Sequence, residues 1–182
     1  MPPTLLPTLP PTLPPTLPPI VVAIYQRQMQ IIRELRDRHL ATVSNEQAQW
    51  RPRPDLPPIA WHAAHASLFT ALTFCGMGRG DWSFATPDEI DTFNFMAPTP
   101  GDLPGLPHLR TRIAAWDAAS DAVAASVTTE ELTVVLPHLR PDWLPDSCRT
   151  WGDSLLYMVT HEPLHHGQIS VLRRLAGHPR IE

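Results

Sequence analysis

Near the C-terminus, residues 161–169 read HEPLHHGQI and place His161 and His165 four positions apart. On an α-helix, residues four apart lie on the same face, one turn and about 6 Å of rise from each other. Two imidazoles at that spacing can bind one metal ion. The segment also satisfies the HExxH pattern, in which two histidines hold zinc and the glutamate activates water in a protease. The spacing therefore has two interpretations, a protease site and another kind of histidine metal site.

Three features argue against an HExxH metalloprotease, which is the least favoured interpretation. Pro163 falls between the two histidines. It has no amide hydrogen to donate to the carbonyl of Val159, and it is expected to bend the turn. Seventeen residues follow His165, and they contain no HxxGxxH extension. The upstream sequence also offers no clear edge strand that would hold an extended peptide substrate.

A third histidine lies about a hundred residues upstream, in the stretch IAWHAAH at residues 59–65. His65 falls on an apolar helical seam with Trp61, Leu68 and Leu72, whereas His62 is expected beside that seam. A lone histidine on an apolar face is usually a satisfied core residue, but three buried imidazoles would each need a partner. We predict that His65 joins the two histidines of the C-terminal segment. Three neutral imidazoles suit zinc, nickel or ferrous iron and leave positions open for water or substrate.

Four amphipathic segments are predicted to form the helices that position these histidines. Asp146 or Thr150 is a candidate cap for the last of them. The Pro-rich segments 44–58 and 81–107 read as connections, and the apolar run 132–136 as a small strand or a turn. The fold class is therefore all-α, a four-helix bundle with long connections. The predicted helices cover about residues 20–42, 58 or 59 to the glycines at 76, 78 and 80, 109–127, and 151–175.

The N-terminus carries a low-complexity tract in which a Thr-Leu-Pro unit recurs across residues 2–19. Its nine prolines favour an extended polyproline II tail over a helix or a strand. Such a tail is either a docking peptide for a proline-binding module or a solvated extension, and the lack of flanking basic residues favours the extension. We therefore divide the chain into a tail, residues 1–19, and one helical domain, residues 20–182.

Composition excludes several classes of partner. The 182 residues have a formal net charge of −4, no lysine and scattered arginines, so no basic patch for a nucleic acid is expected. No apolar run is long enough to cross a bilayer, and no signal peptide is recognisable. Cys75 and Cys148 match no zinc or redox pattern, which fits a reducing cytoplasm and leaves a single disulfide open. We expect a cytoplasmic protein with no membrane partner.

IAWHAAH, HEPLHHGQI and the ending SVLRRLAG together resemble the DinB/YfiT-like superfamily of bacterial metal-binding proteins, over about residues 20–177. The resemblance implies a four-helix bundle in which His65, His161 and His165 bind a divalent metal. Family members with known activity use low-molecular-weight thiols, as mycothiol-dependent maleylpyruvate isomerases and thiol S-transferases do. It therefore implies a metal-dependent thiol transferase or isomerase that acts on a small molecule, and a homodimer. This chain has His166 where arginine is frequent, and Pro163 within the motif is unusual.

Further residues are candidates for places around the metal. Tyr157 and Gln168, each one turn from a ligand, are expected either to line the metal cavity or to be ordinary core and flank residues. His62, Glu162 and His166 are candidates for contacts with the ligands rather than with the metal. Zinc is the first choice of cofactor, with nickel or iron as alternatives and a low-molecular-weight thiol as cosubstrate. The rival hypothesis is a metal-binding or stress-related protein without turnover, whose metal would be structural and enclosed by four protein ligands.

Overall fold

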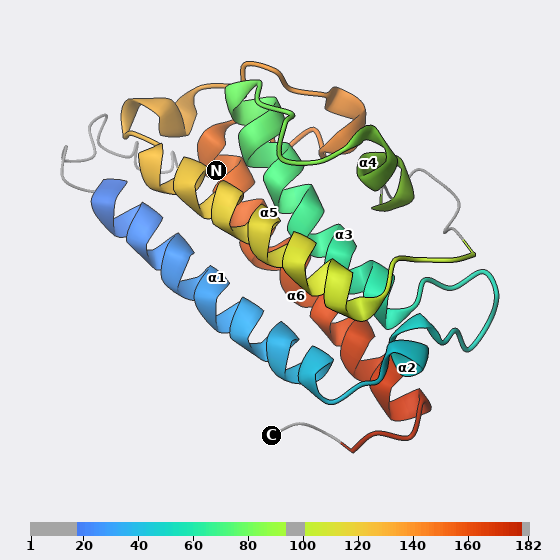
Figure 1. Cartoon of the computed structure of the whole chain (residues 1–182). Coiled ribbons are helices and arrows are strands. Elements are labelled where there is room, and N and C mark those ends of the chain that lie inside the picture. The colour runs from blue at the N-terminus through green and yellow to red at the C-terminus, as the bar shows by residue number, and fades with distance from the viewer. Residues whose placement is uncertain (1–17, 94–100, 180–182) are drawn as a thin grey trace, which may run out of the picture.

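Four long helices form a bundle in the computed structural model, which describes residues 18–93 and 101–179 (Figure 1). The all-α four-helix bundle expected from the sequence is confirmed. Within the described ranges, the β pairing is a single bridge between Val135 and Thr150. None of the helices described is long and apolar enough to cross a membrane. The long helices are α1 (Pro18–Ala41), α3 (Ile59–Ala71), α5 (Leu106–Ser126) and α6 (Trp151–Leu175).

The connections contain short helices that the sequence did not predict. α2 (Asn45–Gln49) begins with a capping box, in which Ser44 and Gln47 bond each other's backbone amides. A second short helix, α4 (Pro87–Phe93), lies in the segment expected to be irregular. The apolar run 132–136 forms a turn and the isolated bridge rather than a strand. Two single turns of 3₁₀ helix complete the connections, η2 (Glu130–Thr133) and η3 (Pro141–Trp143).

The Pro-rich tail ends slightly earlier than expected, because α1 begins at Pro18. The rest of the tail, and with it the expectation of a polyproline II segment, lies outside the described residues. Proline fits the first turn of a helix, because the amides of that turn have no hydrogen-bond acceptor within the helix.

α3 is the central helix of the bundle, and all of its residues are buried. It packs between α5 and α6 and also touches α2 and α4. It continues as a π-helix, η1 (Leu72–Gly78), whose residues are buried as well. The stretch from Ile59 to Gly78 contains no charged residue, which is the composition that burial on all sides requires. The one-sided seam predicted for this helix is therefore wrong, and both of its histidines lie inside the protein.

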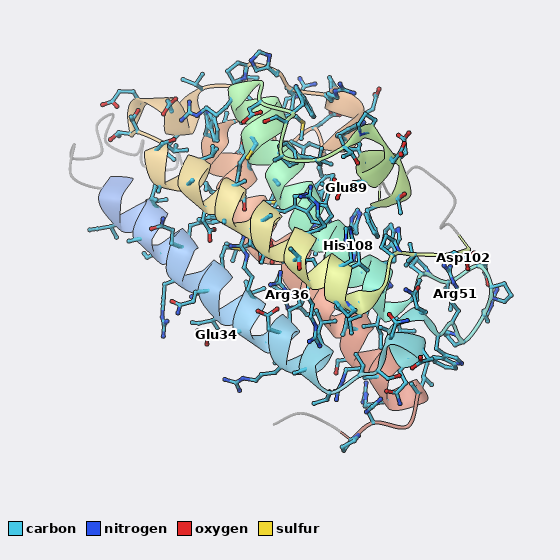
Figure 2. The ribbon with its side chains drawn as sticks, viewed as in Figure 1. Glu34, Arg36, Arg51, Glu89, Asp102 and His108 are labelled. Carbon is cyan, nitrogen blue, oxygen red and sulfur yellow. The ribbon has the colours of Figure 1, made fainter. Side chains whose placement is uncertain are left out.

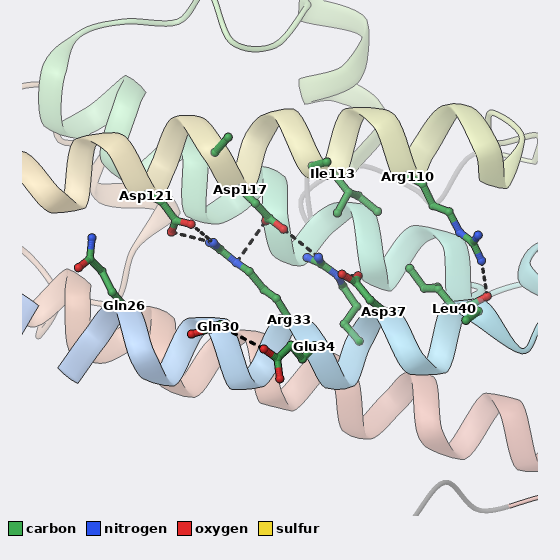
Figure 3. Close-up of a pocket in the computed structure, with 14 residues that line it drawn as sticks. Gln26, Gln30, Arg33, Glu34, Asp37, Leu40, Arg110, Ile113, Asp117 and Asp121 are labelled. Atoms are coloured by element: carbon green, nitrogen blue, oxygen red, sulfur yellow. Dashed lines mark hydrogen bonds and ion pairs between the residues drawn. The ribbon is translucent and has the colours of Figure 1, made fainter. Parts of the chain in front are cut away.

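A buried ion-pair network joins α1 to α5 (Figure 3). Nη1 of Arg33 lies 2.7 Å from both carboxylate oxygens of Asp121, and Nη2 of Arg36 lies 2.8 Å from Asp117. Arg36 is buried between α1 and α5, whereas Glu34 is exposed (Figure 2). These ion pairs border a groove of about 560 Å³. Asp117 and Asp121 thus hold α1 against α5.

α6 begins at a capping box and continues through its internal proline. The hydroxyl of Thr150 accepts a hydrogen bond from the amide of Asp153, so of the two candidate caps the structure uses Thr150. Pro163 lies on an exposed face, and the helix runs without interruption to Leu175. The proline removes one backbone hydrogen bond but does not end the helix.

Two helical glycines make a matched pair for testing the packing. A Cβ atom at Gly78 would overlap the indole ring of Trp151, which is 1% exposed, whereas one at Gly167 would meet no atom within 4 Å. We expect Gly78→Ala to lower the free energy of unfolding by about 1–3 kcal/mol through overpacking. Gly167→Ala should raise it by up to about 1 kcal/mol through helix propensity. Urea denaturation measures both, and equal effects in the two variants would contradict the packing described.

Candidate metal centre

The structure brings together the three histidines that the sequence nominated. His65 comes from α3, and His161 and His165 come from successive turns of α6. One ring nitrogen of each lies within 4.8 Å of the corresponding atoms of the other two. The Nε2 atoms of His161 and His165 are 3.2 Å apart. The spacing that suggested a shared ion therefore yields convergent imidazoles from two helices.

The backbone sets the tautomer of His65. Its Nδ1 lies 2.6 Å from the carbonyl oxygen of Phe93, which only accepts hydrogen bonds. Nδ1 therefore carries the proton, and Nε2 presents a lone pair. The ring of Trp61 stacks on this imidazole at a centroid distance of 4.4 Å and an interplanar angle of 9°. His65 is thus fixed both in tautomer and in orientation.

Burial keeps the three imidazoles neutral. Desolvation lowers the pKa of His65 to about 4 and that of His161 to about 3. The pKa of His165 is lowered further, by desolvation and by the neighbouring histidines. Neutral imidazoles are the form that binds metals, and converging lone pairs repel one another unless a cation or a proton lies between them. The residues therefore fit a divalent metal held by three nitrogen ligands.

A cavity of about 410 Å³ opens over the three histidines. Its walls are largely aromatic, with Trp61, Phe69, Trp143 and Tyr157 among the lining residues. The ring of Tyr157 lies 5.6 Å from that of His161, between centroids. Of the two residues proposed to line the metal cavity, Tyr157 is therefore found there.

Gln168 lies elsewhere, on an exposed face of α6. It borders a second groove, of about 550 Å³, which is lined mainly by apolar residues such as Leu56, Leu164 and Val171. Gln168 is not among the residues that line the cavity over the histidines. Its candidate role as a cavity residue is therefore corrected, because one helical turn past His165 carries it around the outside of α6.

Glu162 and His166 face away from the cavity, toward α1. Glu162 has no exposed surface; the hydroxyl of Thr70 donates a hydrogen bond to its Oε1 at 2.9 Å, and Nη2 of Arg33 lies 3.7 Å away. Burial raises the pKa of this carboxyl to about 7. His166 is buried, and desolvation and the positive charge of Arg36 lower its pKa. The glutamate of HEPLH therefore lies outside the cavity where a protease would need its water-activating base.

His62 contacts a candidate ligand directly, in keeping with its candidacy for such a contact, but it lies inside the protein. Its Nδ1 lies 3.1 Å from Nδ1 of His165, and its side chain is buried. The signal that could have placed it inside is the uncharged run from residue 59 to residue 78. A helix covered on all sides has no solvent face to which a histidine could turn.

The lowered pKa values make the metal-free protein sensitive to acid. Each of His62, His65, His161 and His166 has a pKa of about 3 or 4 in the folded state, against 6.5 for a free imidazole. The unfolded chain therefore binds more protons below pH 6.5, and stability is lost as the pH falls from 6.5 toward 4. Glu162 acts in the opposite direction, because its raised pKa removes stability as the pH rises toward 7.

We predict that the four histidines outweigh the glutamate. The free energy of unfolding of the metal-free protein should fall between pH 6.5 and pH 4, by up to about 1.4 kcal/mol per pH unit for each imidazole. Urea denaturation across this range measures the slope, and His166→Gln should make it shallower. A free energy that is constant or rises as the pH falls through this window would contradict the buried, neutral state of the histidines.

Comparison with known families agrees with the geometry. The sequence model of the DinB superfamily matches residues 28–169, a range that contains the three convergent histidines and most of the bundle. A search of curated proteins finds no significant match to the chain. The matched range covers more than half of the sequence, and its helices are those that carry the histidines. The chain belongs to the DinB superfamily.

Proposed function

We propose that this protein is a metal-dependent enzyme that joins a low-molecular-weight thiol to a small molecule, as a thiol S-transferase or a thiol-dependent isomerase. The observation that carries the proposal is the set of three neutral imidazoles at the base of a cavity. Within the described residues, no fourth histidine, cysteine or carboxylate joins that set. Structural zinc sites are usually closed by four protein ligands, whereas catalytic sites keep a position open.

The donor set suits zinc first, and nickel or ferrous iron next. A divalent metal held by His65, His161 and His165 would lower the pKa of a thiol that coordinates it, and so would supply a thiolate at neutral pH. In S-transfer the thiol loses its proton, a carbon–sulfur bond forms, and the leaving group departs with the electrons of the broken bond. In isomerisation the thiol adds to the substrate and is eliminated again, so it is regenerated.

The cavity sets the size and character of the substrate. A volume of about 410 Å³ holds a small molecule rather than a folded partner or a peptide chain in a long cleft. Its aromatic walls offer stacking faces to an apolar group. Burial raises the pKa of the Tyr157 phenol, which therefore stays protonated at neutral pH and serves as a hydrogen-bond donor.

The protease alternative lacks its base in this arrangement. Glu162 contacts Thr70 and Arg33 on the side of α6 that faces α1, whereas the cavity lies on the side of His161 and His165. The remaining rival is a metal-binding protein without turnover, in which the position left open by the three histidines would not exchange ligands.

Cobalt(II) substitution tests the thiol proposal. We expect 2-mercaptoethanol to add a near-ultraviolet sulfur-to-cobalt charge-transfer band to the spectrum of the cobalt-loaded protein, because the site offers an open position to a thiolate. Ethylene glycol, in which a hydroxyl replaces the thiol, is the matched control and should add no such band. A panel of bacterial thiols with small electrophiles then tests turnover. A spectrum that no thiol alters, with no thiol-dependent product, would favour the structural metal.

A further inference from the structure

His62 and His165 face each other through the same ring atom. Their Nδ1 atoms are 3.1 Å apart, a hydrogen-bond distance. Histidines that bind metals are neutral imidazoles, and a neutral imidazole carries a single ring proton. One Nδ1 must then donate and the other accept. Which of them donates decides whether Nε2 of His165 presents a lone pair to the other histidines or a proton.

The nitrogen that faces the shared metal position decides the direction of that hydrogen bond. Nε2 of His165 lies 3.2 Å from Nε2 of His161, within the group of three converging ring nitrogens. A neutral His165 that binds a metal through Nε2 carries its proton on Nδ1. That proton is directed at Nδ1 of His62, which must then accept it.

We propose that His62 is a positioning residue that holds His165 in the tautomer protonated at Nδ1, with the lone pair of Nε2 directed toward His161. The inference rests on the proposed metal-binding function, because that lone pair matters only if it is a ligand. The opposite arrangement places a proton on His165 Nε2, 3.2 Å from Nε2 of His161, where it blocks coordination.

The surroundings of His62 keep its ring from turning. It is 6% exposed, and the ring of Trp61 meets it edge-on at a centroid distance of 5.4 Å. His65 has a simpler arrangement with the same result, since the Phe93 carbonyl accepts directly from its Nδ1. Acceptors on the outer nitrogen are known to orient metal-binding histidines and to raise their basicity. His165 thus has a second imidazole, in place of a backbone carbonyl, as the acceptor for its outer nitrogen.

Two substitutions separate this role from simple packing. His62→Asn places an amide oxygen near the position of Nδ1, where it can accept the proton of His165. His62→Leu fills a similar space without an acceptor. We expect His62→Leu to weaken zinc binding about 10–100-fold, and His62→Asn to restore affinity close to the original value. Competition with a chromophoric chelator measures both, and His138→Leu, at an exposed position, is the control.

The tautomer itself is measurable without metal. Two-bond ¹H–¹⁵N correlation spectra of the metal-free protein should show His165 protonated at Nδ1, and His62→Leu should shift it toward the Nε2-protonated form. His65 should stay protonated at Nδ1 in both proteins, because Phe93 is unchanged, and this reports that the fold is intact. Predominant Nε2 protonation of His165 in the original protein would overturn the proposal.

Equal zinc affinity in His62→Leu and the original protein would also overturn it, as would an Asn variant as weak as the Leu variant. These results differ from a failure of the proposed function. If the original protein binds no zinc or cobalt at all, the proposed metal-dependent function is rejected. The spectra of the metal-free protein still decide the tautomer of His165.

Discussion

The burial of α3 on every side is the constraint on which the rest of the structure depends. A helix with no solvent face can carry no unpaired charge, and the run from Ile59 to Gly78 has none. Its two histidines are consequently neutral and need partners inside the protein. His65 forms a hydrogen bond with the Phe93 carbonyl, and His62 forms one with His165. The convergent lone pairs of the candidate metal centre follow from that exclusion of water and charge.

The buried charged residues lie instead between α1, α5 and α6. α6 separates the two environments, because neighbouring residues on it face opposite ways. His161 and His165 face the cavity, whereas Glu162 meets Arg33, which also pairs with Asp121 of α5. The same short segment thus supplies candidate metal ligands to one side and part of a buried ion-pair network to the other. This arrangement explains why an HExxH string can occur here without the geometry of a protease.

Spacing in the sequence was enough to predict the bundle and the three convergent histidines. Histidines four apart on a helix must share a face, and an apolar seam through His65 points to the core. His62 was a candidate for contact with the ligands, but which ligand it would meet was beyond such reasoning. Its contact with His165 depends on how α3 is rotated within the bundle.

Two other residues show the same limit. The charge of Asp117 favours a solvent face, but a buried arginine on α1 reverses that preference. Gln168 was a candidate either for the metal cavity or for the flank of the helix, and its spacing from His165 alone could not decide between them. Short helices such as α2 depend on local capping bonds that hydrophobic periodicity does not register. Periodicity therefore predicts which residues share a face, but not what covers that face.

The most direct test of the histidine centre is the metal content of the purified protein and of three single variants. If His65, His161 and His165 together hold the ion, the original protein binds one equivalent of a divalent metal, and His65→Ala, His161→Ala and His165→Ala each lose it while remaining folded by circular dichroism. Stoichiometric metal retained in any one of these folded variants would contradict the assignment of that histidine and the three-nitrogen centre built on it.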